Sequence, residues 1–491
     1  MKILDVAIIN GTIIDGTGRP RFKSDIGIKN DRIVRVGNIE EDSIVIIDAK
    51  GLFVTPGFID IHSHSDLNIR EAPSMENMLR QGVSTQIVGN CGINLGIQEG
   101  SLSNFMEELE RTGIGTNLAF LVGHGALRRR IMDLEDRPPT KDELKLMEFL
   151  LEEALGEGAI GLSTGLEYPP GIYAKTTELI ELSKIVSKRD GIYATHLRNE
   201  GDKVEEAVRE AIEIGEKTEV SVQISHHKAE KRKNWGKIEI TLGMIDDAKS
   251  RGLDISCDVY PYTAYMTRLG TPLLPPWALN ESLSEPDTYG KVLAELKRVA
   301  IDWDLIYIAR CNLDKSMEGC NILELARKAG VPPEEFALQL LIKDERVGII
   351  SFQMSEDDVR KVIKYPHSFI GSDGSGYIRR SREERTHPRS FGTFPRVLGR
   401  YTRELQLLSW EEAISKMTFL PSKKTRLSDR GIIREGAYAD IVIFDPEKII
   451  DRATYEDPFQ YPEGIEYLII NGQLVIIKGV YTGKRIGRIL K

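Results

Sequence analysis

The order of apolar and polar residues predicts short β-strands near the start of the chain. Residues 6–14 place Asn10-Gly11 between two apolar runs, and Asn-Gly in that setting is a strong signal for a two-residue hairpin turn. A second hairpin is expected over 26–36, where Asn30-Asp31 interrupts the apolar positions. The first part of the chain is therefore expected to form a small set of paired strands.

The end of the chain repeats this pattern. Residues 467–477 again read strand, Asn-Gly, strand, and a further apolar run precedes them at 440–446. The two ends of a domain commonly lie close together in space. We therefore expect residues 1–56 and 426–491 to form one small β-sandwich domain.

The middle of the chain alternates between strands and helices. A Thr-x-x-Glu capping box over 140–143 opens a helix with apolar residues at helical spacing, and a buried strand follows at 159–163. The cycle repeats at intervals of roughly 30 residues, which is typical of βαβ units in a parallel sheet. Residues 57–425 have room for enough units to close a catalytic (β/α)8 barrel of the TIM type.

One stretch breaks the alternation. Residues 268–344 carry a Pro-rich segment at 271–277 and no regular strand-helix cycle, so we expect an insertion on a barrel loop that acts as a lid. The barrel pattern is expected to resume with a strand at 347–352 and to end with a strand at 368–373.

Composition narrows the class of protein. The chain has 491 residues, with 66 Lys+Arg against 75 Asp+Glu, and 41% of its residues are hydrophobic, enough for a sizeable core. A net charge of −9 without any basic block argues against nucleic acid as a partner. No apolar run approaches the ~18 residues that a membrane span needs.

The early sequence and the cysteines indicate the compartment. An acidic residue, Asp5, comes too early for a secretory signal, and the four cysteines form no C-x-x-C pair. Free, scattered thiols suit a reducing environment. We therefore expect a cytoplasmic enzyme with a small-molecule substrate.

Histidines supply the first candidate chemistry. His62 and His64 directly follow the apolar run 58–61, and on a strand residues i and i+2 point to the same side. At the C-terminal end of a barrel strand, that side faces the active-site mouth. Taken alone, the pair is explained equally well as an exposed His-x-His that arises by chance.

Further potential ligands end other expected strands. They are Cys91, His196, His226 and Asp373. Zinc accepts imidazole nitrogen and thiolate sulfur, and a catalytic site keeps one position for water. The combined set predicts a metal site built from several strand ends, whereas His227 points the opposite way from His226 and is expected to be packed.

Other motifs carry no chemistry. The glycine-rich segment 371–376 lacks the Gly-Lys-Ser/Thr ending of a phosphate loop, and no G-x-S-x-G stands in a strand-turn-helix setting. Cys257, Cys311 and Cys320 have no histidine at useful spacing and are expected to be packed thiols.

Several motifs together resemble one known family. They are residues 54–64 (VTPGFIDIHSH), 89–92 (GNCG), 195–200 (THLRNE), 225–228 (SHHK), 258–264 (DVYPYTA), 372–374 (SDG) and 387–399 (HPRSFGTFPRVLG). In this order, and over nearly the whole chain, they are similar to the D-aminoacylase (N-acyl-D-amino-acid deacylase) family of the amidohydrolase superfamily.

The resemblance implies roles for the metal ligands. The tightly held zinc of the family would be bound here by Cys91, His196 and His226. His62 and His64 would contribute to a second, weaker metal position. In this family the cysteine takes the place of the carboxylated lysine that bridges two metals in many amidohydrolases.

The resemblance also implies roles for four residues around the substrate. Asp373 would be the catalytic acid/base, Arg389 would bind the substrate carboxylate with help from Tyr260, and Lys228 matches a family lysine. Independent chemistry supports the first two: a carboxylate can move the proton of the attacking water, and a guanidinium pairs with a carboxylate through two parallel hydrogen bonds. Arg389 as a surface residue of a basic loop and Tyr260 as a core residue remain the alternatives.

The expected reaction is zinc-dependent hydrolysis of the amide bond of N-acyl-D-amino acids to a carboxylate and a free D-amino acid. Zinc lowers the pKa of its bound water toward 7, which makes hydroxide available at neutral pH. The preference for D over L rests on the resemblance alone. The side-chain pocket is not fixed by the sequence, although Met266 and Arg268 follow the DVYPYTA motif closely.

Two rival interpretations stay open. The first is a hydrolase of the same superfamily that acts on a cyclic amide, as hydantoinases do, or on a dipeptide; a ring substrate without a free carboxylate would not need Arg389 and Tyr260. The second is a barrel scaffold that has lost catalysis, which the complete set of ligands argues against.

Overall fold

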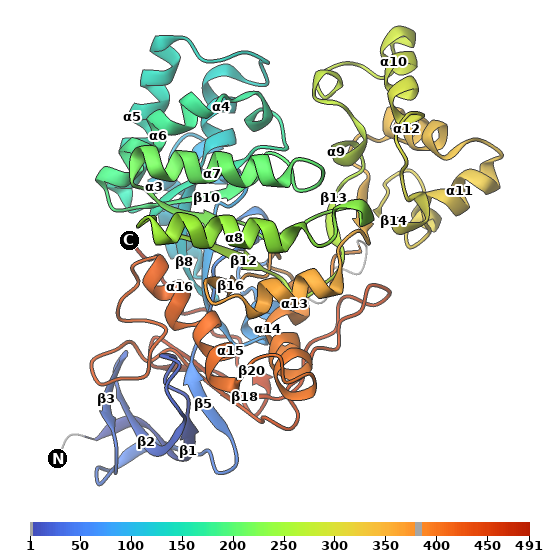
Figure 1. Ribbon diagram of the computed structural model, residues 1–491. Coiled ribbons are helices and arrows are strands. Elements are labelled where there is room, and N and C mark those ends of the chain that lie inside the picture. The colour runs from blue at the N-terminus through green and yellow to red at the C-terminus, as the bar shows by residue number, and fades with distance from the viewer. Residues whose placement is uncertain (1–2, 379–384) are drawn as a thin grey trace.

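The computed structural model describes residues 3–378 and 385–491, and its centre is a parallel barrel (Figure 1). The barrel strands are β6 (Phe58–Asp60), β7 (Val83–Val88), β8 (Asn117–Gly123), β9 (Gly161–Gly165), β10 (Ile192–His196), β11 (Ser221–Ile224), β12 (Ile255–Val259) and β16 (Ser368–Ile370). They run in the order β16-β12-β11-β10-β9-β8-β7-β6. The predicted (β/α)8 barrel is confirmed.

The first and last barrel strands meet just beyond their C-terminal ends. The Asp373 N–H donates to the His62 carbonyl at 2.8 Å, and the His64 N–H donates to the Gly374 carbonyl at 2.7 Å. A backbone bridge between Ser63 and Gly374 lies between these bonds. The barrel therefore closes through the segments that carry its candidate chemistry.

Helices cover the outside of the barrel. They are α1 (Glu76–Leu79), α2 (Leu95–Gln98), α3 (Leu102–Thr112), α4 (His124–Met132), α5 (Lys141–Glu157), α6 (Thr176–Lys188), α7 (Val204–Thr218), α8 (Lys237–Ser250), α13 (Glu356–Lys364), α14 (Arg389–Arg396), α15 (Trp410–Met417) and α16 (Phe419–Lys424). The predicted capping box opens α5: the Glu143 N–H donates to the Thr140 hydroxyl, and the Glu143 carboxylate accepts from the Thr140 N–H. Gly158, at a φ of 115°, ends this helix.

A second, smaller unit stands beside the barrel (Figure 1). Strands β13 (Tyr265–Arg268), β14 (Ile306–Arg310) and β15 (Gly348–Ser351) form an antiparallel sheet with β15 in its centre. Helices α9 (Gly270–Leu273), α10 (Pro286–Leu296), α11 (Ile322–Ala329) and α12 (Pro333–Lys343) accompany it. Residues of these elements, among them Ile308, Leu338 and Ile349, form a hydrophobic cluster of their own.

This sheet corrects one prediction. The expected strand at 347–352 exists, but it pairs antiparallel with β13 and β14 and is not part of the barrel. Its apolar run could serve a parallel or an antiparallel sheet equally well, because periodicity does not identify the partner of a strand.

The two chain ends share one sheet of nine strands. These are β1 (Leu4–Ile13), β2 (Phe22–Lys29), β3 (Arg32–Val36), β4 (Ser43–Asp48), β5 (Phe53–Pro56), β17 (Ile441–Phe444), β18 (Ile465–Ile470), β19 (Gln473–Ile477) and β20 (Val480–Tyr481). The predicted hairpins at Asn30-Asp31 and Asn471-Gly472 are confirmed. The pairing of β17 with β5 joins the C-terminal strands to the N-terminal ones.

The predicted turn at Asn10-Gly11 is wrong. Strand β1 continues through this dipeptide, and the register against β2 shifts between Ile8 and Gly11. Asn10 adopts a φ of 62° at this bulge. A Cβ on Gly11 would lie 2.7 Å from Cγ2 of Val54, so the glycine permits the close approach of β5 to β1.

Strand β17 is buried on both faces, and so is the second half of β18. Ile441, Ile443 and Ile469 pack into the core of the chain-end sheet. Val442 and Leu468, which point the other way, belong to the main core beneath the barrel helices. The sheet and the barrel are therefore joined by side chains of the same strands.

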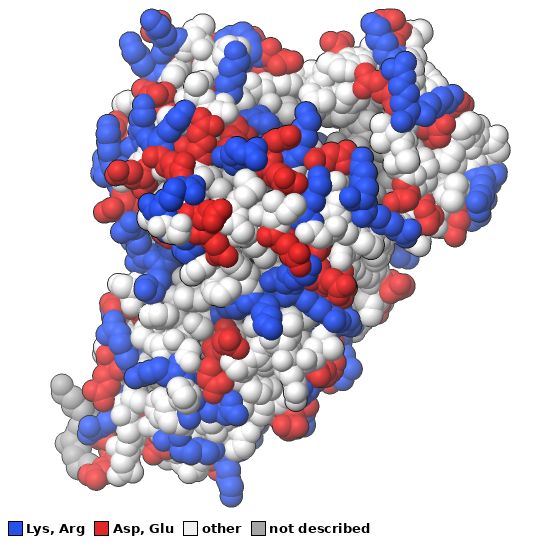
Figure 2. Space-filling model, in the orientation of Figure 1, with Lys and Arg blue, Asp and Glu red and all other residues white. Residues whose placement is uncertain are grey.

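The surface is charged but mixed. On the face shown in Figure 2, Lys and Arg side chains alternate with Asp and Glu over the barrel helices and the smaller unit. Within the described residues, no helix combines the length and the apolar character that crossing a membrane requires.

Candidate active site

The candidate ligands converge at the C-terminal ends of the barrel strands. His62 and His64 follow β6, Cys91 follows β7, His196 ends β10, His226 follows β11 and Asp373 follows β16. His62, Cys91, His196 and His226 are buried, and the side chains of His64 and Asp373 are only 15% and 10% exposed. The structure thus brings together residues that lie up to 311 positions apart in the chain.

Cys91 is the centre of a three-ligand group with His196 and His226. Its Sγ lies 3.6 Å from Nε2 of His226 and 4.0 Å from Nδ1 of His196, and these two nitrogens are 2.9 Å apart. These ligand atoms can share one metal ion.

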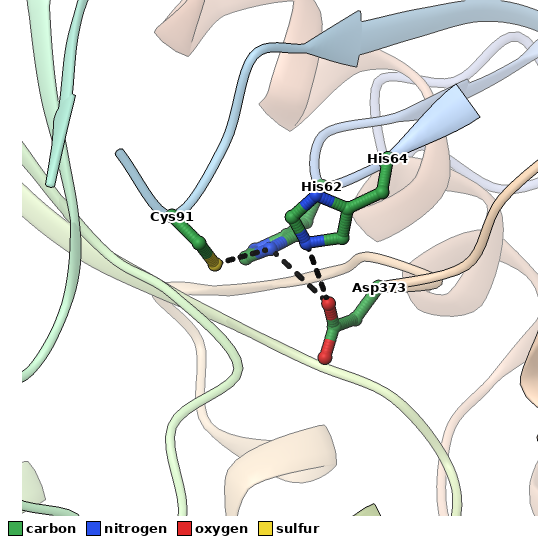
Figure 3. Close-up of side chains that lie close together, drawn as sticks. All are labelled: His62, His64, Cys91 and Asp373. Atoms are coloured by element: carbon green, nitrogen blue, oxygen red, sulfur yellow. Dashed lines mark hydrogen bonds and ion pairs between the residues drawn. The ribbon is translucent and has the colours of Figure 1, made fainter. Parts of the chain in front are cut away.

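A second group, drawn in Figure 3, shares the same thiol and consists of Cys91, His62, His64 and Asp373. The Cys91 Sγ is 3.4 Å from Nε2 of His62. Oδ1 of Asp373 lies 3.5 Å from that nitrogen and 3.1 Å from Nε2 of His64. Two candidate metal positions therefore meet at one sulfur atom.

The donor set fits zinc. Bonds of ~2.0 Å to nitrogen and ~2.3 Å to sulfur in a tetrahedron separate two nitrogens by about 3.3 Å and nitrogen from sulfur by about 3.5 Å. The separations around Cys91, His196 and His226 lie within about 0.5 Å of these values, with the two nitrogens closer together and the sulfur farther from each of them. A cation between them would also satisfy two ring nitrogens that face each other at 2.9 Å inside the protein.

The charged neighbours favour the ionised forms of the two acids. Burial raises the pKa of the Cys91 thiol, but the charge of His62 and hydrogen bonds with His196 and His226 hold this pKa well below its ordinary value. Burial likewise raises the pKa of Asp373, and the Arg389 guanidinium outweighs it, so that this pKa also lies well below its usual range. Both shifts favour the anionic form of the side chain.

Three site residues have a strained backbone. Cys91, His226 and Asp373 adopt φ angles of 53°, 34° and 49°, in the left-handed region that side chains other than glycine rarely enter. Such positions cost about 1–3 kcal/mol each and persist where the surroundings fix them. Here the Asp258 carboxylate accepts from the His226 N–H, and the His62 carbonyl accepts from the Asp373 N–H.

The expected substrate-binding residues border this centre. Arg389, at the start of α14, places Nη1 2.7 Å from Oδ2 of Asp373, and its guanidinium lies 4.8 Å from the centre of the Tyr260 ring. The Tyr260 hydroxyl contacts the Met354 sulfur at 3.7 Å. Lys228 instead points at Glu200 and His226.

The other residues singled out in the sequence lie outside this centre. His227 is buried with Nε2 2.8 Å from the Thr241 hydroxyl, as expected for a packed residue. Met266 packs with Phe352 in a small apolar cluster, and Arg268 is exposed. Part of the basic loop before Arg389, residues 379–384, lies outside the described residues.

Four buried or half-buried neighbours were not predicted as site residues. Oδ1 of Asp258 lies 3.3 Å from Nδ1 of His62, and Oε1 of Glu200 lies 2.9 Å from Nδ1 of His226. Tyr168 packs on the His196 ring at 4.7 Å, beside Glu167. Asp258 and Glu200 stand in quoted motifs close to strand ends, and this position was the available signal.

Comparison with known proteins places the chain in a family. The profile described as the amidohydrolase family matches residues 45–290 and 284–476, most of the chain. The chain therefore belongs to the amidohydrolase family, as its barrel and its cluster of potential metal ligands lead one to expect.

Individual relatives match over their full length. The chain is 35% identical to a D-aminoacylase and 36% identical to an N-acyl-D-glutamate deacylase, both of Alcaligenes xylosoxydans xylosoxydans. These matches cover 99% of the chain and 97% and 96% of the relatives. The structure resembles that of N-acyl-D-glutamate deacylase from Bordetella bronchiseptica, solved with zinc and a phosphonate mimic of the tetrahedral intermediate, with a TM-score of 0.87, 34% identity and full coverage of both chains.

Proposed function

We propose that the protein is a zinc-dependent hydrolase that cleaves the amide bond of N-acyl-D-amino acids, releasing a carboxylate and a free D-amino acid. The observation that carries this proposal is the buried group of Cys91, His196 and His226 beside an Asp373–Arg389 ion pair. Full-length similarity to proteins named D-aminoacylase and N-acyl-D-glutamate deacylase supports the substrate class.

Five side chains would hold metal in this proposal. Cys91, His196 and His226 would bind one zinc ion tightly, and His62 and His64, with the shared sulfur, would serve a second and weaker position. Bound zinc supplies a Lewis acid for the substrate carbonyl and lowers the pKa of water. The lowered pKa of the Cys91 thiol supports this role, because the thiolate is the form that binds metal.

Asp373 moves the proton. Its carboxylate is ionised and can accept a proton from the attacking water as the oxygen–carbon bond forms. The amide nitrogen is a poor leaving group as an anion, so Asp373 then delivers this proton to nitrogen as the carbon–nitrogen bond breaks. The imidazoles of His62 and His64, 3.5 and 3.1 Å from Oδ1 of Asp373, orient the carboxylate for both transfers.

Arg389 orients the substrate. A guanidinium has five N–H donors, and the contact with Asp373 uses one arm, so a substrate carboxylate can pair with the remaining donors. The Tyr260 ring beneath the guanidinium holds it in place. This anchoring of an α-carboxylate favours a linear N-acyl amino acid over a cyclic amide.

We also propose the domain division at residues 1–56 with 426–491, 57–425, and an insertion at 268–344 that acts as a lid, in a cytoplasmic protein. The separate apolar cluster of the insertion supports its independence. A hydrogen bond from the Asn280 side chain to the Leu134 carbonyl links it to a barrel loop.

The test is release of free amine from matched N-acetyl-D and N-acetyl-L amino acids, with and without added zinc. We expect hydrolysis of the D series alone, and little hydrolysis of N-acetyl amines that lack the carboxylate. Cys91→Ala should lose tight zinc binding and activity together. Hydrolysis of cyclic amides but not of the D series would overturn the proposal in favour of a hydantoinase-like enzyme.

A further inference from the structure

A buried carboxylate stands behind one of the proposed zinc ligands. Glu200 follows β10 in the loop that starts at His196, and its side chain is 2% exposed. Its Oε1 lies 2.9 Å from Nδ1 of His226, on the opposite side of the ring from the nitrogen that faces Cys91. Its Oε2 lies 2.5 Å from Nζ of Lys228. Neither this carboxylate nor Lys228 belongs to the three-ligand group.

The proton on the His226 ring decides whether it can bind metal. A neutral imidazole carries its proton on one nitrogen and a lone pair on the other. For Nε2 to bind a cation, the proton must be on Nδ1, and this nitrogen then needs an acceptor. Oε1 of Glu200 lies at hydrogen-bond distance and has no other partner among the described residues, and as a carboxylate it has no proton to donate. In this structure the hydrogen-bond contact of Nδ1 is with Lys228, so the ring must turn slightly for Glu200 to accept from it.

Lys228 could impose the opposite state. Its Nζ lies 2.9 Å from Nδ1 of His226 as well as close to Glu200. A lysine ammonium that donated to Nδ1 would leave the ring proton on Nε2, aimed at Cys91 and His196. The two neighbours of Nδ1 therefore favour different tautomers of the same ring.

We infer that Glu200 is a positioning residue: it holds His226 with its proton on Nδ1, keeps Nε2 free for zinc, and binds the ammonium of Lys228 so that it does not donate to the ring. This inference rests on the proposed role of His226 as a zinc ligand. A hydrogen-bonded carboxylate behind a metal-binding histidine fixes the orientation of the ring and raises its basicity.

The same carboxylate is a poor candidate for a metal ligand itself. Glu167, His196 and Glu200 lie close enough together to share a cation. However, Oε2 of Glu200 already pairs with Lys228, and an ammonium at 2.5 Å repels a metal ion from that oxygen. Glu167 and Glu200 lie 3.4 and 3.8 Å from Nε2 of His196, the nitrogen turned away from Cys91, so they support this ring from behind as well.

The experiment measures zinc affinity by competition with a chromogenic chelator, so that it does not depend on turnover. In Glu200→Gln, the amide cannot accept from both His226 and Lys228, because one of its two ends is a donor. We expect zinc to bind about 10- to 100-fold more weakly than in the wild type. Glu200→Asp keeps the charge on a shorter side chain and should lie between the two.

A double variant tests the part played by Lys228. In Glu200→Gln/Lys228→Met, the competing ammonium is gone and the amide oxygen is free to accept from Nδ1 of His226. We expect this double variant to bind zinc more tightly than Glu200→Gln alone. Equal or weaker binding would overturn the competition between Glu200 and Lys228.

The chain offers a matched control. Glu178 is also buried and contacts a histidine and a cation, with Oε1 2.8 Å from Nε2 of His124 and Oε2 2.7 Å from Nη1 of Arg128. Neither partner belongs to a candidate metal group among the described residues. Glu178→Gln should therefore keep the zinc affinity of the wild type even if it lowers the melting temperature.

Three outcomes separate the two proposals. Weakened binding in Glu200→Gln, with a folded protein by circular dichroism and normal binding in Glu178→Gln, supports the inference. Wild-type affinity in Glu200→Gln, when His226→Ala abolishes tight binding, overturns the inference and leaves the proposed function standing. Tight binding that survives in His226→Ala overturns the ligand assignment and the inference together.

Discussion

Cys91 is the residue on which both candidate metal positions depend. Its sulfur belongs to the group with His196 and His226 and to the group with His62, His64 and Asp373. Loss of the thiol would dismantle both positions, whereas loss of His64 would affect one. If both positions hold metal as proposed, a single side chain would link the second position to the first.

Asp373 is the residue whose proposed role is most directly testable. Asp373→Asn keeps the size of the side chain but can neither accept nor deliver the proton, so kcat should fall about 10²- to 10⁴-fold. Tight zinc binding should remain, because the three-ligand group does not include this carboxylate. Steady-state kinetics with zinc content measured on the same sample checks both expectations.

The control for this variant is Asp190→Asn, at a side chain that is 80% exposed in an ion pair with Arg426. It should behave like the wild type. A kcat for Asp373→Asn within a few-fold of the wild-type value would remove Asp373 from the proton transfer.

The candidate site residues that could be predicted from the sequence are those that stand at the ends of strands. Cys91, His196 and His226 stand at or just after strand ends, and in a barrel these ends meet at one mouth. Glu200 stands in a quoted motif close to a strand end, which was an available signal, but its role, like that of Tyr168, comes from the side chains that it contacts across the loops. No periodicity or spacing encodes those contacts.

At the scale of elements, the sequence predicted helix caps and turns from local motifs more reliably than it predicted which strands pair with each other. The capping box of α5 and the Asn471-Gly472 turn follow from short-range hydrogen bonding and backbone preference. The dipeptide Asn10-Gly11 carries the same turn signal. In the structure, however, β1 continues through it and pairs with β5, and Gly11 lets Val54 of β5 pack close to the backbone of β1. Tertiary contacts decide between two conformations that the local sequence allows equally.

The start of α5 makes stability depend on pH in a defined direction. Hydrogen bonds from Arg137 and from the Thr140 N–H lower the pKa of Glu143 from 4.5 to about 2. Because the folded-state pKa is the lower one, the stabilisation is present above pH 4.5 and is lost as the pH falls toward 2. Glu143→Gln should therefore lower the melting temperature at about pH 6, and the difference from the wild type should shrink toward about pH 3.

Thermal unfolding of both proteins across this range provides the measurement. Glu152→Gln, at an exposed carboxylate of the same helix, is the matched control and should show no such trend. A difference between Glu143→Gln and the wild type that stays constant with pH would exclude the capping carboxylate as its source.

At the scale of the molecule, the smaller unit has its own apolar cluster, whereas strands of the chain-end sheet place side chains in the main core as well as in their own. The alternating faces of β17 place Ile441 and Ile443 in one core and Val442 in the other. The sequence predicted that both chain ends build one β domain. It could not predict this shared packing, because an unbroken apolar run shows burial on both faces without identifying what covers each.

A chain that begins at residue 57 tests this arrangement. It would keep β17 but lose β5, leaving a strand edge without its partner and one apolar face of β17 in water. We expect this shortened protein to aggregate, with a size by light scattering well above that of the intact chain at equal concentration. A monodisperse, zinc-binding product would show that the barrel does not need the chain-end sheet.

At Cys91, His226 and Asp373 the backbone conformation that the fold requires favours glycine, whereas the proposed reaction requires a side chain. At each of these positive φ angles, glycine is the residue that the main chain accommodates without strain. Each position instead carries a side chain that the proposed reaction uses. Selection for a higher melting temperature alone would therefore favour glycine at these three positions, and it would produce a more stable protein without the proposed catalytic and metal-binding side chains.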